Sequence, residues 1–268
     1  MKSSPRLTIA GVPVDHTTLR EAAAMVLGRL LAPRGPQPML IMGPNAHLMT
    51  LAQKHARFAE ALRASDLNVP DGMSVVLASR ILGHSLPERV TGGDLMEELC
   101  RQAALHGLSI FLLGGLPMAA RLAARKLQRK YPGLKVAGTY CPPMGFESCR
   151  EENSRIQDLI AAARPDLLFV AFGAPKQELW MHEICRSLPV GAVLSVGAAL
   201  DTQAGLRRRA PRWTHRTGLE WFYRLLLEPR RLWRRYLLGN PYFLYLVLRQ
   251  RFFPKDFCQL LPELHTKS

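Results

Sequence analysis

The 268-residue sequence has few cysteines, a deficit of acidic side chains and no long apolar run. Its five cysteines, Cys100, Cys141, Cys149, Cys185 and Cys258, form no Cys-x-x-Cys pair and no even set. Disulfide frameworks and zinc ribbons need such pairs, so neither class is expected, and a reducing compartment is the simpler interpretation. No stretch of about 20 apolar residues occurs, so we expect no membrane-spanning helix.

Several sequence signatures of catalysis are also absent. The chain has no Gly-x-Gly-x-x-Gly fingerprint, no Walker A motif and no Gly-x-Ser-x-Gly elbow, which argues against dinucleotide enzymes, P-loop NTPases and α/β-hydrolases. Its histidines show no metal-like spacing with cysteines, and no Asp-x-Asp pair occurs, so we expect no metal and no cofactor. Residues 1–15 lack a long apolar stretch, so a signal peptide is not expected.

Short apolar segments alternate with helical patterns over the first 204 residues. This alternation predicts an α/β fold, Rossmann-like, with a mostly parallel sheet and helices on both faces. The expected strands are residues 7–9, 39–42, 67–69, 109–113, 135–139, 167–172 and 192–196. The expected helices are residues 18–31, 46–62, 72–82, 94–106, 117–130, 150–163 and 175–186. Residues 141–147 hold two prolines and a glycine and are expected to form a loop.

Positive charge is concentrated near the C-terminus. The net charge is +15, and residues 205–251 contain twelve arginines, no lysine and two glutamates. We therefore expect a core over residues 1–204 and a basic helical appendage over residues 205–268. Such a segment attracts phosphate, either in nucleic acid or on an anionic membrane.

The segment 229–238 has the pattern of an amphipathic helix. At about 100° per residue its arginines fall on one side and its apolar residues on the other. The arginines are Arg230, Arg231, Arg234 and Arg235, and the apolar residues are Leu232, Trp233, Tyr236 and Leu237. This pattern is typical of a helix in a membrane interface, where Trp and Tyr suit the headgroup level. The alternative is a helix docked on the protein's own core, but the charge density exceeds what solubility requires.

A nucleic-acid-binding protein is the alternative from another class, and a pI of about 10.2 permits it. The basic side of the segment is paired with an apolar side rather than with an exposed stacking platform, so we expect no nucleic-acid partner. A non-catalytic membrane scaffold is a third alternative.

Four turns follow predicted strands, at residues 43–45, 70–72, 114–117 and 173–178. Ligands of open parallel sheets bind beyond the carboxyl ends of the strands. In the last two turns glycine precedes a proline at the expected helix start, which leaves backbone amides for a phosphate. Each turn alone is more simply an ordinary connection, but the four together favour a shared cleft for an anionic ligand.

Asp71 is the best candidate for an acid or base. It lies between Pro70 and Gly72, where a carboxylate can project into a cleft and take the proton of an attacking hydroxyl. The spacing allows equally that Asp71 caps the next helix. Asp94 is favoured as such a cap, and Arg89 either meets a phosphate or pairs nearby.

The sequence resembles the WecG/TagA/CpsF glycosyltransferases (glycosyltransferase family 26). The matching motifs include Pro44-Asn45-Ala46, Pro70-Asp71-Gly72, residues 86–95 (Leu-Pro-Glu-Arg-Val-Thr-Gly-Gly-Asp-Leu), residues 111–115 (Phe-Leu-Leu-Gly-Gly) and residues 172–178 (Phe-Gly-Ala-Pro-Lys-Gln-Glu). Residues 209–213, 218–221 and 228–236 resemble the family's C-terminal appendage. Together these motifs are specific, and they span residues 7–240.

The resemblance implies an inverting transferase that moves a sugar from a UDP-sugar to a polyprenyl-diphosphate-linked sugar, and the absence of an Asp-x-Asp pair predicts that it acts without a metal. It implies a cytoplasmic protein, peripheral on the inner face of the plasma membrane and engaged with an anionic membrane surface, and it leaves self-association into a homo-oligomer open. Asp71 matches the family's proposed general base. The implied substrate-binding residues are Asn45, Gly72, Arg89, Thr91, Gly92, Asp94, Gly114, Gly115, Gly173, Pro175, Gln177 and Glu178. The implied acceptor-diphosphate or membrane contacts are Arg216, Arg224, Arg230, Arg231, Arg234, Arg235 and Trp233.

One departure from the family concerns Gly43. Many members have threonine there, so that threonine's role is absent in this chain or filled by another group. The loss favours a hexose donor such as UDP-glucose and a role in exopolysaccharide synthesis. UDP-N-acetylmannosamine and UDP-N-acetylmannosaminuronate are the alternative donors.

Overall fold

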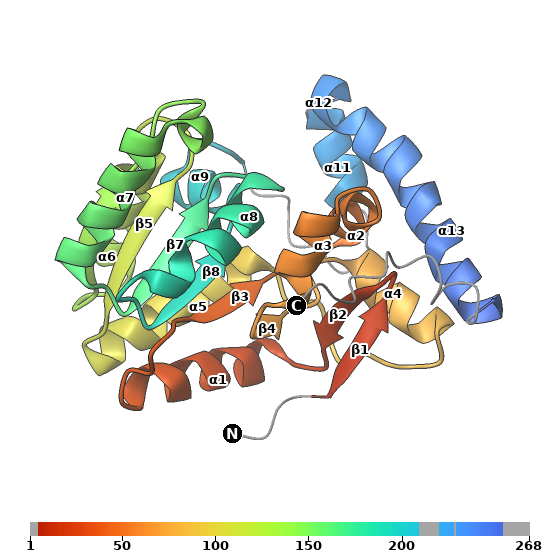
Figure 1. The fold of residues 1–268 in the computed structure, drawn as a ribbon, viewed down its shortest axis with the longest axis horizontal. Coiled ribbons are helices and arrows are strands. Elements are labelled where there is room, and N and C mark those ends of the chain that lie inside the picture. The colour runs from red at the N-terminus through yellow and green to blue at the C-terminus, as the bar shows by residue number, and fades with distance from the viewer. Residues whose placement is uncertain (1–4, 209–219, 228, 254–268) are drawn as a thin grey trace, which may run out of the picture.

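The computed structural model describes residues 5–208, 220–227 and 229–253. Its centre is a six-stranded parallel sheet with the order β4-β3-β8-β7-β5-β6, and a separate antiparallel hairpin pairs β1 with β2 (Figure 1). The strands are β1 (Arg6–Ile9), β2 (Val12–Asp15), β3 (Met39–Met42), β4 (Leu67–Asn68), β5 (Ser109–Gly114), β6 (Lys135–Tyr140), β7 (Leu167–Ala171) and β8 (Ala192–Ser195). The predicted α/β class with a parallel sheet is confirmed.

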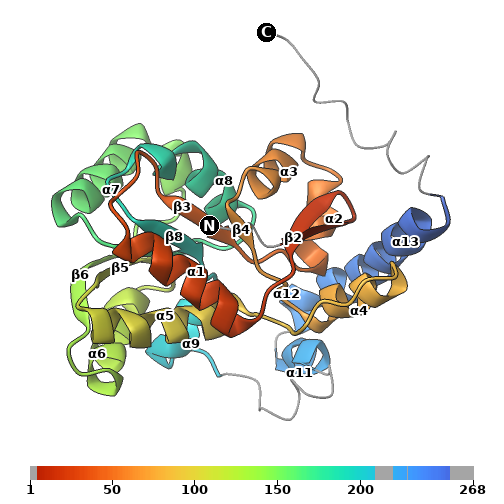
Figure 2. The same cartoon turned by 90° about the horizontal axis from the view of Figure 1, so that it is seen from below.

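Helices surround this sheet and follow most of its strands. They are α1 (Leu19–Leu31), α2 (Ala46–Ala52), α3 (Ala56–Arg63), α4 (Met73–Ile81), α5 (Gly92–His106), α6 (Ala119–Lys130), α7 (Arg150–Ala163), α8 (Lys176–Glu183), α9 (Ala199–Ala204), α11 (Glu220–Leu227), α12 (Pro229–Trp233) and α13 (Gly239–Phe252). Short 3₁₀ turns are η1 (Phe146–Ser148) and η2 (Cys185–Ser187), and η3 (Arg234–Leu238) is a π-helical turn. Figure 2 shows α1, α5 and α6 on one side of the sheet and α3, α7 and α8 on the other.

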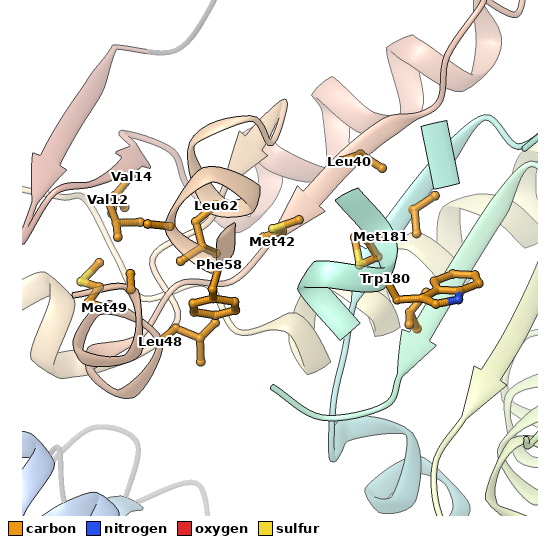
Figure 3. Packing of buried hydrophobic residues seen from close by; sticks show 14 of the residues in the cluster. Val12, Val14, Leu40, Met42, Leu48, Met49, Phe58, Leu62, Trp180 and Met181 are labelled. Atoms are coloured by element: carbon orange, nitrogen blue, oxygen red, sulfur yellow. The ribbon is translucent and has the colours of Figure 1, made fainter. Parts of the chain in front are cut away.

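Two apolar clusters, one on each face of the sheet, hold the layers together. Every residue of β7 is buried, and its side chains alternate between the clusters: Leu168 and Val170 join one, Leu167 and Phe169 the other. This alternation is what a strand covered on both faces requires. Around β3, Phe58 and Leu62 of α3 pack with Met42 in the first cluster (Figure 3).

Most element ends lie within a residue or two of the predictions, and the helix α9 was not predicted. Three differences bear on the site or its support. The expected helix over residues 46–62 is divided into α2 and α3, because the Gln53 side chain donates to Ala10 O at 2.7 Å and ties the end of α2 to the hairpin. Strand β2 was not predicted; it pairs with β1 across a turn with positive φ at Ala10 and Gly11. Helix α5 begins at Gly92, two residues earlier than expected.

The C-terminal elements pack on the body beside α2 and α4 (Figure 1). In α13, Phe243, Leu246 and Val247 are buried and belong to the same apolar cluster as α2. The far end of α13 is held by Gln250, whose amide accepts from Ala10 N at 2.8 Å and donates to Thr8 O at 2.7 Å. The division at residue 204 therefore stays a prediction about sequence character, since α13 shares a core with the body.

Residues 229–238 combine features of the two alternatives, a helix docked on the core and a helix with an exposed apolar side. Leu232 and Tyr236 are buried, but Trp233 and Leu237 are 42% and 55% exposed. Residues four apart share a helix face, whereas neighbours in sequence point about 100° apart, so the four apolar residues cannot all face the body. No helix in residues 5–208, 220–227 or 229–253 has the length and apolar character needed to cross a bilayer.

Candidate functional site

A cavity of about 980 Å³ lies at the carboxyl ends of β3, β4, β7 and β8. Loops after these four strands form one wall, and residues of η3 and the start of α13 form the opposite wall. Carboxyl strand ends are where ligands of open parallel sheets bind, as the sequence predicted. The volume is in the range of small-molecule and cofactor sites.

Asp71 lines this cavity on the loop after β4. The loop is held beside the one after β3, because Val69 N donates to Met42 O at 2.9 Å and Asp71 N donates to Pro44 O at 3.2 Å. The N-cap of α4 is Gly72, with φ 134°, and no side chain makes a cap hydrogen bond there. Gly72 rather than Asp71 therefore occupies the N-cap position, and Asp71 is a half-buried residue of the cavity wall.

Asn45 and His47 bring the start of α2 to the same wall. The Asn45 side-chain oxygen accepts from His47 N at 3.1 Å and from Leu48 N at 3.2 Å, so Asn45 caps α2. Burial and the charge of Arg235 lower the pKa of His47 to about 4, so its imidazole is neutral at physiological pH. The sequence analysis missed His47, although it lies two residues after a predicted site residue.

The loop before α5 contributes Arg89, Thr91 and Gly92 to the cavity, whereas Asp94 lies outside its lining. Thr91 caps α5: its hydroxyl accepts from Asp94 N at 3.0 Å and donates to the Asp94 carboxylate at 2.7 Å. The favoured alternative, in which Asp94 itself caps the helix, is therefore wrong: Thr91 is the cap and Asp94 is its partner in the first turn. A Cβ at Gly92 would lie 2.9 Å from Ser195 O, so glycine lets α5 approach β8.

The start of α8 places Gly173, Gln177 and Glu178 in the lining, but not Pro175, which is the N-cap residue. Glu178 is 0% exposed and accepts from Gln177 Nε2 at 2.6 Å. Within the described residues, Glu178 Oε2 and Gln177 Oε1 are both buried without a hydrogen-bond partner. Burial raises the pKa of Glu178 to about 7.

Gly114 and Gly115 lie outside the cavity, and the predicted phosphate site there is not supported. The amide of Gly115 donates to Ala171 O at 2.9 Å, and the amide of Leu116 donates to the Asp201 carboxylate at 2.8 Å. Added Cβ atoms would meet Ala171 O at 2.7 Å from Gly114 and Ala119 Cβ at 2.9 Å from Gly115. Close packing therefore accounts for both glycines, and an internal carboxylate already occupies the turn.

Of the predicted appendage residues, the structure brings Arg234 and Arg235 to the cavity. Arg230 and Trp233 are exposed and lie outside its lining. Arg224 and Arg231 belong to α11 and α12, but their side chains lie outside the described part of the chain, as does the whole of Arg216.

The cavity therefore holds two kinds of charge. Lys54, Arg89, Arg234 and Arg235 supply positive charge suited to a diphosphate, and Asp71 supplies a carboxyl group suited to proton transfer. Across residues 5–208, 220–227 and 229–253, no group of three or more His, Cys, Asp or Glu is placed to hold a metal ion.

Comparison with known proteins gives one family and a consistent set of relatives. A model of the glycosyl transferase WecG/TagA/CpsF family matches residues 7–257. A Bacillus subtilis (strain 168) protein is 32% identical over 224 residues, which cover 84% of each chain. A Staphylococcus aureus (strain NCTC 8325) protein is 28% identical over 249 residues, covering 93% of this chain and 94% of its own. Both relatives are named N-acetylglucosaminyldiphosphoundecaprenol N-acetyl-beta-D-mannosaminyltransferase.

Proposed function

The chain belongs to the WecG/TagA/CpsF family of glycosyltransferases, and we propose that it moves an N-acetylmannosaminyl group from a UDP-sugar to N-acetylglucosaminyl-diphospho-polyprenol. The activity for which both relatives are named supports this transferred sugar and this acceptor. It favours the amino-sugar alternative over the glucose donor and exopolysaccharide role that the loss of threonine at Gly43 suggested.

Asp71 is the proposed general base. The acceptor hydroxyl gives its proton to the carboxylate as its oxygen attacks the anomeric carbon from the face opposite UDP. The new bond joins that oxygen to the anomeric carbon, and the bond from this carbon to the diphosphate oxygen breaks with inversion. One observation carries this role: Asp71 lines the cavity while Gly72 occupies the N-cap position.

Negative charge that develops on the leaving diphosphate needs a positive partner. Arg234 and Arg235 line the cavity on the side of η3. Arg89, in the loop before α5, lines it on the side of the α/β body (the body wall). Guanidinium groups bind phosphate with two parallel hydrogen bonds, and such preorganised charge stabilises a leaving group without a metal. We propose metal-independent transfer; full loss of turnover in excess chelator would contradict it.

Gln177 and Glu178 are proposed to receive hydroxyl groups of the donor. The unpartnered Gln177 Oε1 accepts a hydrogen bond, and Glu178 Oε2 accepts one when ionised and can donate one when protonated, so both suit hydroxyl groups. The uridine ribose and the transferred sugar both carry such hydroxyls. Both oxygens are closed off from solvent, so a small side-chain movement must accompany this contact.

The C-terminal helices are proposed to hold the protein on the inner face of the plasma membrane. Large apolar side chains are exposed along them at Trp221, Phe222, Leu226, Trp233, Leu237, Leu238, Leu244, Tyr245, Leu248, Phe252 and Phe253. Exposed Arg230 and Arg251 add positive charge beside this surface. Apolar and cationic groups together suit an anionic bilayer. Flotation with anionic but not neutral vesicles is expected, and binding to RNA or DNA without vesicle binding would contradict the proposal.

The variant Asp71→Asn tests the proposed reaction. It should lower kcat by more than 10²-fold, the usual contribution of general base catalysis, because the amide cannot take the proton. The assay offers a panel of UDP-sugars, including UDP-glucose, with a polyprenyl-diphosphate-N-acetylglucosamine acceptor in detergent. Unchanged UDP affinity and thermal midpoint would show that the site is intact. Retained turnover would remove Asp71 from the mechanism, and a preference for UDP-glucose would overturn the proposed donor.

A further inference from the structure

Gly43 is the first residue of the loop that follows β3, and it lies beside Asp71. It is buried and lines the cavity. A Cβ built on Gly43 would lie 3.2 Å from Asp71 Cβ, 3.7 Å from Cγ and 3.6 Å from Oδ2. The φ angle of Gly43 is not positive, so its backbone conformation does not require glycine. A side chain here would thus be tight against Asp71 and would require that residue to shift by a few tenths of an ångström.

The main chain around Asp71 leaves little room for adjustment. Asp71 N donates to Pro44 O at 3.2 Å, and Pro70 O accepts from Val90 N at 3.0 Å. These bonds tie the loop after β4 to the loop after β3 and to the segment before α5. The nearest atom is Asp71 Cβ, which rotation of the side chain does not move, so a side chain at position 43 would displace Asp71 Cβ and, with it, the carboxylate.

We propose that Gly43 is a positioning residue, which sets where the Asp71 carboxylate stands in the cavity. The inference rests on the proposed function, in which Asp71 takes the acceptor's proton. A methyl group at position 43 would push the carboxylate out of line by a few tenths of an ångström. A hydroxyl at the same Cβ would add a second effect, because it comes within hydrogen-bond reach of Oδ2 and stabilises the ionised form.

The variant Gly43→Ala tests the positional effect. We expect kcat to fall about tenfold, since misplacement of a reacting group by about 1 Å costs about 10²-fold and the shift here is smaller. UDP affinity, measured by calorimetry, should stay within twofold because the cationic groups are untouched. The matched control is Gly28→Ala in α1, where an added Cβ meets nothing within 4 Å. It should keep the kcat of the parent.

The variant Gly43→Ser separates contact from hydrogen bonding. Its hydroxyl should move the acid limb of the kcat pH profile to lower pH, because a donated hydrogen bond makes the carboxylate harder to protonate. Gly43→Ala should lower kcat without shifting the acid limb of the pH profile. Should Gly43→Ala fold poorly, the UDP affinity and the pH limb of Gly43→Ser still decide the matter.

Two outcomes would overturn the inference. One is a kcat for Gly43→Ala within twofold of the parent, and the other is identical pH limbs for the two variants. Failure of the proposed function looks different: Asp71→Asn would then keep its turnover. An inactive Asp71→Asn beside an unaffected Gly43→Ala would leave the proposed base in place and refute only the role of Gly43.

Discussion

The two walls of the cavity are built in different ways. The body wall consists of strand-end loops whose backbones are hydrogen-bonded to one another, such as Asp71 N to Pro44 O. The opposite wall consists of side chains from η3 and α13, including Arg234, Arg235 and Tyr242. This wall is held on the body by the apolar packing of α13 and by the hydrogen bonds of the Gln250 side chain at the far end of α13.

This contrast suggests a division of labour. A carboxylate that takes a proton must be placed within a fraction of an ångström, which a sheet edge provides. A cation that binds a diphosphate tolerates larger shifts in position, because charge attraction falls off slowly with distance. We therefore expect changes in the body wall to affect kcat, and changes in the helical wall to affect substrate binding.

Arg235→Ala tests this division with the largest expected effect. Loss of one charged partner of a half-buried phosphate costs about 2–4 kcal/mol, or roughly 30- to 1,000-fold in kcat/KM. The loss should appear as a raised KM for the UDP-sugar or the lipid acceptor, with a smaller fall in kcat because Arg235 is also proposed to stabilise the charge that develops on the leaving diphosphate. Arg121→Ala, an exposed arginine of α6 that is not part of the cavity lining, is the control. A fall in kcat alone, with KM unchanged, would place Arg235 with the chemical step and break the comparison.

Gln250→Ala tests how the helical wall is held. The variant loses hydrogen bonds to Ala10 N and Thr8 O, each worth about 0.5–1.5 kcal/mol. The thermal midpoint should fall by several degrees, and the KM for substrate should rise several-fold as η3 loosens. Gln128→Ala is the matched control, because that amide makes a single long bond of 3.4 Å to Leu134 O. A lowered midpoint with unchanged KM would show that apolar packing alone positions η3.

The fold was largely predictable because buried strands such as β7 are uninterrupted apolar runs. Strand β2 was not, since four residues with a proline carry a weak pattern and gain their order from pairing with β1. The division between α2 and α3 depends on Gln53 reaching Ala10, a contact 43 residues apart that no local pattern encodes.

The sequence predicted that the site lies at the carboxyl ends of strands, but it could not predict which strands lie side by side in the sheet. Turns after β3, β4 and β7 do line the cavity, but the turn after β5 with Gly114 and Gly115 does not. In the sheet β5 is separated from β3 by β7 and β8, so its carboxyl end lies too far along the edge. That order is a property of the tertiary fold. For the same reason the loop after β8, which packs against Gly92, was not predicted as part of the site.

Glu178 provides the last and smallest test, a pH dependence of the body wall. Its pKa is raised from 4.5 to about 7 in the fold, so the folded protein binds this proton more tightly than the unfolded chain. The free energy of unfolding should therefore decrease as the pH rises from about 4.5 to 7 and stay lowered above that. Glu178→Gln should remove this slope in denaturant titrations at pH 5, 6, 7 and 8, whereas Glu60→Gln, exposed on α3, should keep it. Parallel curves for the parent and Glu178→Gln would mean that burial does not shift the titration of Glu178. Water would then have to reach the unpartnered Glu178 oxygen, and the body wall would be more open to solvent than the wall that carries Arg234 and Arg235.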